Sequence, residues 1–283
     1  MKKIISSVFA IFCFTIGLFA QDFQGKAIYE SRLTTAPDFG GREMPEAQKK
    51  RIMESMKSAS ERTFILTFDR TTSYYVEDEK LEAPGSGGFG GRFRMMGMMR
   101  GGTPDGKLYK NTKEGQFVNQ VEAYSKIFLI KDELKKPEWQ MGAETKKIGN
   151  YTCYKATLTI PIDTTGIGEM TRRFRRPGSQ SQQRAIPTER HVTAWYTLDI
   201  PISQGPSNYW GLPGLILEIE EGNTTLVCSK IVINPKESIV VEAPKKGKEI
   251  NQKSFDEMMV KKRQEMMENF QQRGRGGRGG GFR

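Results

Sequence analysis

Four methionines in one glycine-rich stretch carry the most unusual chemistry in this chain. Thioether sulfurs are soft ligands that favour Cu(I), so such a cluster could hold that ion. The same stretch, Pro84–Gly102, also holds three arginines, which repel cations, and no histidine. Two interpretations therefore stay open, a Cu(I) site and a low-complexity loop. The four candidate ligands are Met95, Met96, Met98 and Met99.

Residues that could form a catalytic site are sparse. The only histidine, His191, begins a predicted strand, where a surface position is the simpler interpretation. Glu218 and Glu220 alternate along a strand, and we interpret them as its outward face rather than a catalytic carboxylate pair. The sequence contains no zinc-ligand or phosphate-loop motif. These observations favour a protein that is not an enzyme.

The most informative stretch is Gly205–Glu221, which reads GPSNYWGLPGLILEIEE. Leu212 opens a tight turn in which Pro213 presets φ and Gly214 is expected to supply a positive φ. The residues after the turn alternate between apolar and mixed positions, which predicts a long strand.

Two aromatic residues, Tyr209 and Trp210, come just before this turn. We expect them to be exposed because they sit in a loop opened by Gly205-Pro206, and exposed aromatic side chains beside a constrained turn often serve as binding anchors. The alternative is that they cover one end of a sheet. The candidate binding residues are Trp195, Tyr209, Trp210, Leu212 and Pro213.

The stretch resembles the signature of the GLPGLI family, secreted proteins of Bacteroidetes whose domain, also called Porph_ging, has no established function. The resemblance extends to residues 149–156 (GNYTCYKA), to residues 194–197 (AWYT) and to Gly205-Pro206. It covers roughly residues 22–235. It implies a secreted accessory of outer-membrane transport, of the TonB-dependent kind.

The first twenty residues have the pattern of a secretory signal. Lys2 and Lys3 precede an apolar run, and Leu18-Phe19-Ala20 is an acceptable cleavage site before Gln21. We therefore expect export, to the periplasm or to the outer membrane.

Two cysteines, Cys153 and Cys228, remain after this signal, and both lie in predicted strands. Thiols outside the cytoplasm can oxidise, and a bridge between strands is geometrically possible. The alternative is two separately buried small side chains. Both alternatives stay open.

Basic residues gather in three low-complexity segments that account for all of the net charge of +11. These are two insertions, at 84–102 and 171–190, and an Arg-Gly tail, at 271–283. Their composition is typical of flexible chain. We expect them to contact anionic envelope surfaces. Export makes nucleic acid an implausible partner.

The remaining pattern consists of many short alternating segments and few helices. It predicts a mainly β fold, with one large curved antiparallel sheet, half-barrel-like, and a few peripheral helices. The β domain is expected over residues 21–243, followed by a linker and a helix over 244–270. A further helix is predicted at Pro45–Ala59.

The leading functional hypothesis is a non-catalytic envelope protein that binds a ligand or a protein partner. One alternative is an extracytoplasmic copper-binding protein that uses the methionine cluster. A second is a hydrolase whose site cannot be recognised in the sequence.

Overall fold

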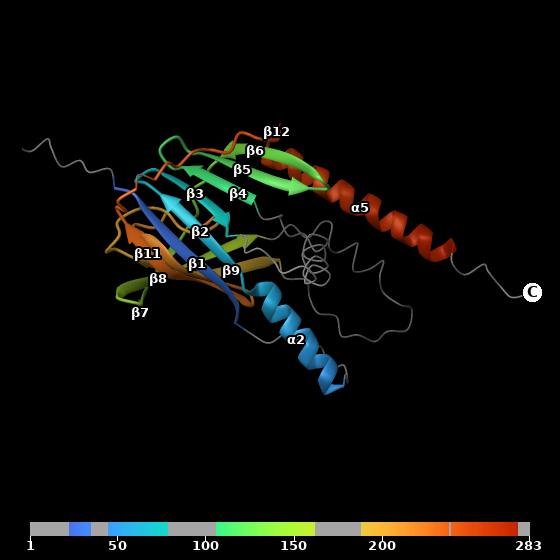
Figure 1. The fold of residues 1–283 in the computed structure, drawn as a ribbon, viewed down its shortest axis with the longest axis horizontal. Helices are drawn as coiled ribbons and strands as arrows, with labels where there is room; N and C mark the ends of the chain where they lie inside the picture. Colours follow the sequence, from blue (N-terminus) through green and yellow to red (C-terminus); the bar gives the residue numbers. More distant parts are fainter. Residues whose placement is uncertain (1–22, 35–44, 79–105, 162–187, 238, 277–283) are drawn as a thin grey trace, which may run out of the picture.

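The computed structural model describes residues 23–34, 45–78, 106–161, 188–237 and 239–276, which form one twelve-stranded sheet and two helices (Figure 1). The strands are β1 (Gly25–Leu33), β2 (Thr63–Phe68), β3 (Thr72–Glu77), β4 (Gly106–Asn111), β5 (Gln116–Ala123), β6 (Lys126–Glu133), β7 (Gln140–Ile148), β8 (Tyr151–Pro161), β9 (Glu189–Thr197), β10 (Leu215–Glu221), β11 (Thr224–Ile233) and β12 (Lys248–Ile250). The helices are α2 (Glu46–Ser60) and α5 (Gln252–Gly276).

The sheet is open, and its strand order is β12-β6-β5-β4-β3-β2-β1-β11-β10-β9-β8-β7. Neighbouring strands are antiparallel except for β12, which runs parallel to β6. The predicted mainly β fold with one large antiparallel sheet is confirmed.

Alternation of side chains explains the strands. In β2, Phe64, Leu66 and Phe68 are buried, and the residues between them are half-buried. In β8, Ala156 and Leu158 pack into one apolar cluster with Tyr154 and Ile160 beside them, as the period of two requires. Strands such as β2 and β8 thus form because their sequences provide one apolar face.

The sheet curves so far that strands distant in its order share one core. Leu108 of β4 and Cys153 of β8 belong to the same buried cluster, although six strands separate β4 from β8. Ile200 and Ile202, from the connection between β9 and β10, also lie in this cluster. That connection therefore packs inside the curved sheet and not on its rim.

Helix α5 is attached to the sheet by its first turns. Phe255 and Met259 pack on Val121, Phe128 and Ile130 of β5 and β6. Figure 1 shows the rest of the helix extending beyond the sheet.

Two predicted boundaries need correction, and one strand was missed. Helix α5 runs to Gly276 and takes in the start of the predicted Arg-Gly tail, where Gln271, Gln272 and Arg273 are good helix formers. Strand β9 begins at Glu189, inside the predicted insertion 171–190. Strand β12 was not predicted, because three residues are too short to show an alternating pattern. The predicted signal, 1–20, and the insertion 84–102 lie outside the described residues.

Candidate functional site

The loop that carries the GLPGLI motif is hydrogen-bonded to a buried lysine on β4. We call residues 203–214 the motif loop. The ammonium nitrogen of Lys110, on β4, donates hydrogen bonds to the carbonyl oxygens of Gly205 at 2.8 Å, Ser207 at 2.8 Å and Tyr209 at 3.4 Å. The Lys110 side chain is fully buried. Burial lowers its pKa to about 7.

A second polar contact ties the base of the motif loop to the sheet. Ser73 of β3 donates a hydrogen bond of 2.8 Å to the side-chain oxygen of the fully buried Gln204. The amide nitrogen of the same side chain, Nε2, has no hydrogen-bond partner within the described part of the chain. The loop thus enters the curved sheet with one unsatisfied donor.

The aromatic pair of the motif loop is buried, so the predicted exposure is wrong. Tyr209 is 9% exposed and Trp210 is 8% exposed. The Tyr209 hydroxyl donates to Glu221 at 2.5 Å, and Trp139 donates from its indole nitrogen to the Trp210 carbonyl at 2.8 Å. Burial, together with the negative charge of Glu221, raises the pKa of Tyr209. The alternative interpretation, that the pair covers part of the sheet, agrees with this burial.

The turn that follows also differs from its prediction. Leu212 is fully buried and Pro213 is exposed. Gly214 does not have a positive φ; among the loop glycines that conformation belongs to Gly211, at φ +93°. Glycine is needed at 214 for another reason, because a Cβ atom there would lie 1.9 Å from the carbonyl oxygen of Thr197. The turn therefore depends on close backbone contact between the start of β10 and the end of β9.

A groove of about 1190 Å³ runs beside α5 and is also lined by residues of β5, β6 and the motif loop. We call it the α5 groove. Its apolar lining comes from Phe117, Leu134, Trp210 and Val260, and Asn208 of the motif loop lies at the same wall. Its charged lining residues are Asp132, Glu133, Lys135, Lys253, Asp256, Glu257 and Lys261. Trp210 thus joins the motif to the α5 groove.

Two carboxyl groups of the α5 groove have shifted pKa values. Backbone hydrogen bonds, first from Gln252 and then from Glu133, lower the pKa of Asp132. The bond from the Gln252 nitrogen to Asp132 measures 2.9 Å and fixes the start of α5 against β6. Burial raises the pKa of Asp256. The helix and the groove wall are therefore held in one arrangement at their common end.

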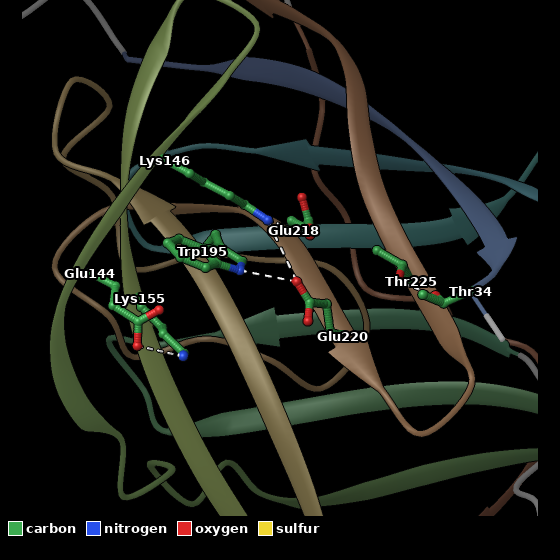
Figure 2. Close-up of polar contacts among 8 residues, drawn as sticks. All are labelled: Thr34, Glu144, Lys146, Lys155, Trp195, Glu218, Glu220 and Thr225. Carbon is green, nitrogen blue, oxygen red and sulfur yellow. Dashed lines mark hydrogen bonds and ion pairs between the residues drawn. The ribbon is translucent and has the colours of Figure 1, made fainter.

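The remaining predicted binding residue, Trp195, lies in a separate ionic cluster (Figure 2). Lys146 of β7 lies 4.3 Å from the Trp195 ring centroid. Its ammonium group is 2.6 Å from Glu218 and 3.5 Å from Glu220. The Trp195 indole donates to Glu220 at 3.2 Å. One lysine and one indole thus contact the carboxylates of Glu218 and Glu220 on β10.

Glu218 is buried, which corrects the prediction of an outward strand face. A register shift between Ile216 and Glu218 turns Glu218 onto the face that carries Trp195. Burial raises the pKa of Glu218, against the effect of Lys146. Burial of Glu220 acts in the same sense, but hydrogen bonds from Glu218 and Trp195 outweigh it and lower its pKa. The two carboxyl groups therefore differ in acidity although they sit side by side.

The surroundings of the two cysteines and the histidine do not activate these residues. Cys153 and Cys228 lie unbridged in the same buried cluster in this structure, and burial raises their pKa values to about 11 and about 12. The disulfide stays a prediction. His191 is exposed on β9 and lies 3.2 Å from the Thr159 hydroxyl.

The proposed Cu(I) ligands, Met95, Met96, Met98 and Met99, lie outside the described residues. Within the part that is described, no three His, Cys, Asp or Glu side chains gather closely enough to hold a metal ion. Neither α2 nor α5, the two helices described, is long and apolar enough to span a membrane.

Sequence reasoning missed Lys110. It lies in a predicted strand with polar neighbours, so it is indistinguishable there from a surface lysine. Its partners are about a hundred residues away along the chain. The one available signal was that Lys110 lies two residues after the apolar Leu108 and so on the same face of the strand.

The fold and the anchored loop define an open, curved β-sheet domain with a groove beside one helix. The family described as "Protein of unknown function (Porph_ging)" matches residues 139–218, from Trp139 through the motif loop to Glu218. This match confirms the resemblance that the motif predicted, over a shorter span than the roughly 22–235 expected.

Two solved structures resemble the chain in shape. Both are of PNGF-II, in space groups C2 and P21, each with a TM-score of 0.46 and 14% identity. They cover 85% and 83% of this chain, which spans 33% of the PNGF-II chain in each case. No curated protein matches.

Proposed function

We propose that the protein is a non-catalytic, exported binding protein that holds a segment of an envelope protein partner in the α5 groove. The observation that carries this proposal is the groove itself, whose wall includes Trp210 of the motif loop. Its volume of about 1190 Å³ is above the roughly 300–1,000 Å³ of small-molecule pockets. An extended or helical protein segment fits such a groove better than a small ligand does.

The lining of the α5 groove favours an amphipathic segment. Apolar side chains, including Phe117 and Val260, would take the apolar face of a partner, and charges of both signs flank them. Lys253 and Lys261 lie on α5 together with Asp256 and Glu257, so neither sign dominates on the helix. The partner we expect is therefore a mixed-charge protein segment rather than a strongly acidic or basic one.

Export and an outer-membrane partner are part of the proposal. The first twenty residues have a secretory pattern, and the family resemblance implies an accessory of a TonB-dependent transporter. Arginine-rich segments at 84–102, 171–190 and 271–283 would add attraction to an anionic envelope surface.

The ionic cluster around Lys146 supports a structural role more than a hydrolytic one. Glu218 and Glu220 differ in pKa, as an acid and base pair would. Lys146 contacts both carboxyl groups, however, and its cation lies on the Trp195 ring. Both carboxyl groups are therefore paired with a cation that the protein itself supplies.

Site-specific photo-crosslinking in living cells tests the proposal. A photoreactive residue at Val260, 37% exposed in the groove, is expected to capture one envelope protein reproducibly. The matched control is Met141, 57% exposed on β7 at the opposite edge of the sheet. Equal capture of the same protein from both positions, or none from Val260, would contradict the proposal.

A further inference from the structure

The motif loop alternates between residues that face Lys110 and residues that face the α5 groove. The carbonyl oxygens of Gly205, Ser207 and Tyr209 point at the lysine. The side chains of Asn208 and Trp210 line the groove. One buried side chain therefore holds the backbone from which the groove wall projects.

The number of donors on this side chain depends on its proton. A protonated lysine has three N–H donors, which match the three carbonyl oxygens around Lys110. A neutral amine has two donors and a lone pair, so at least one carbonyl oxygen must lose its partner. A buried carbonyl group without a partner is costly, and the loop is expected to shift to relieve it.

We propose that Lys110 is a positioning residue that holds the Trp210 wall of the α5 groove in its binding shape only while it is protonated, so that partner binding weakens when the lysine loses its proton. The link to partner binding rests on the proposed function. The effect of the proton on the loop does not.

The surroundings of Lys110 favour loss of its proton below the usual pKa of a lysine. Its neighbours across the strands are Ser73 on β3 and Phe117 on β5, and the buried Gln204 lies beside Ser73. None of these carries a charge. Burial lowers the pKa of Lys110 to about 7, and no charged group of the described residues contributes to that shift.

The contact to Tyr209 is the weakest of the three, at 3.4 Å against 2.8 Å for the other two. We expect it to break first when the proton leaves. The freed carbonyl belongs to the peptide group between Tyr209 and Trp210. The Trp210 carbonyl stays bonded to Trp139 at 2.8 Å, so the change is a local rotation of this peptide group.

Nuclear magnetic resonance of the full chain tests the inference without a partner. The Cε signal of Lys110 is expected to titrate with a midpoint within about one pH unit of 7. The backbone amides of Asn208 and Trp210 are expected to shift with the same midpoint. The variant Lys110→Met removes the titration, and Lys107→Met, at an exposed lysine on the same strand, leaves it unchanged.

Two results would overturn the inference. One is a Lys110 signal that titrates only above pH 9. The other is a Lys110 signal that titrates near 7 while both loop amides stay still. Because these are wild-type measurements, they decide the matter even if Lys110→Met fails to fold.

Crosslinking from Val260 at pH 6 and pH 8.5 then tests the link to binding. We expect several-fold less capture at pH 8.5 for wild type and for Lys107→Met. Capture that does not change, alongside loop amides that do titrate, would overturn the link to binding and leave the role of Lys110 in the loop standing. No capture at either pH would instead contradict the proposed function.

Discussion

Replacing Gly214 by alanine is expected to destabilise the fold through a steric clash. The expected loss of stability is larger than the loss that backbone strain alone causes at other glycines. A Cβ atom at 214 would lie 1.9 Å from the Thr197 carbonyl oxygen and 2.6 Å from its carbonyl carbon. An ordinary contact of this kind is about 3.4 Å, so the start of β10 must move away from β9 by more than about 1 Å. That movement breaks the pairing of Leu215 with Thr197 and the 2.9 Å bond from the Leu215 nitrogen to the Ile200 carbonyl. Losing one or two buried hydrogen bonds together with core packing predicts a loss of about 3–5 kcal/mol.

The matched control is Gly222→Ala, in the turn between β10 and β11. Gly222 has a positive φ of 57° and open space around its Cα, so its replacement costs about 1–2 kcal/mol through backbone strain alone. Chemical denaturation of both variants, followed by far-ultraviolet circular dichroism, measures the two costs. A Gly214→Ala variant no less stable than Gly222→Ala would refute the steric reasoning.

Three further predictions follow from buried ionisable groups. Lys146→Met is expected to lower the free energy of unfolding by about 2–4 kcal/mol, because it leaves the buried carboxyl of Glu218 without its cation. In denaturant titrations, a double variant that also carries Glu218→Gln should recover most of that loss. No recovery would contradict the pairing. Cys153 and Cys228, if unbridged, are expected to react with iodoacetamide at pH 8 far more slowly than they do in the unfolded chain, because burial raises both thiol pKa values; equal rates by mass spectrometry would contradict their burial. Between pH 7 and 10.5 the unfolded chain keeps a proton on Lys110 that the folded chain releases, so the free energy of unfolding of the wild type should rise with pH across this window. The rise should be smaller in Lys110→Met. An equal rise in both proteins would contradict the lowered pKa.

Most of the fold could be predicted because most strands have an alternating pattern of their own. Residues such as Phe64, Leu66 and Phe68 predict a buried strand face from the local sequence alone. The helices were predictable because their apolar residues recur at helical spacing. What the sequence does not contain is the curvature of the sheet, which brings β4 and β8 into one core.

That curvature explains why the aromatic pair was wrongly expected to be exposed. Tyr209 and Trp210 follow glycine and proline, which is typical of a surface loop. In the structure the loop enters the curved sheet, and Glu221 and Trp139 satisfy its polar groups. Local sequence cannot show a cover supplied by distant strands.

The roles of Gly214 and Glu218 depended on backbone details that a pattern does not reveal. A Pro-Gly pair predicts positive φ at the glycine, but here the glycine is required by the carbonyl of Thr197. Strict alternation predicts that Glu218 points outward, but a register shift beside Ile216 reverses it. Both features arise where β9 and β10 meet, inside the segment that matches the family.

The affinity of the captured partner for two arginine variants tests the central claim, binding in the α5 groove, most directly. Val260→Arg places a long charged side chain on the apolar lining of the groove, and Met141→Arg makes the same change at the opposite edge of the sheet. Isothermal titration calorimetry is expected to show at least about tenfold weaker binding for Val260→Arg, about 1.4 kcal/mol, and less than twofold change for Met141→Arg. Unchanged affinity for Val260→Arg, or a greater loss for Met141→Arg, would contradict binding in this groove.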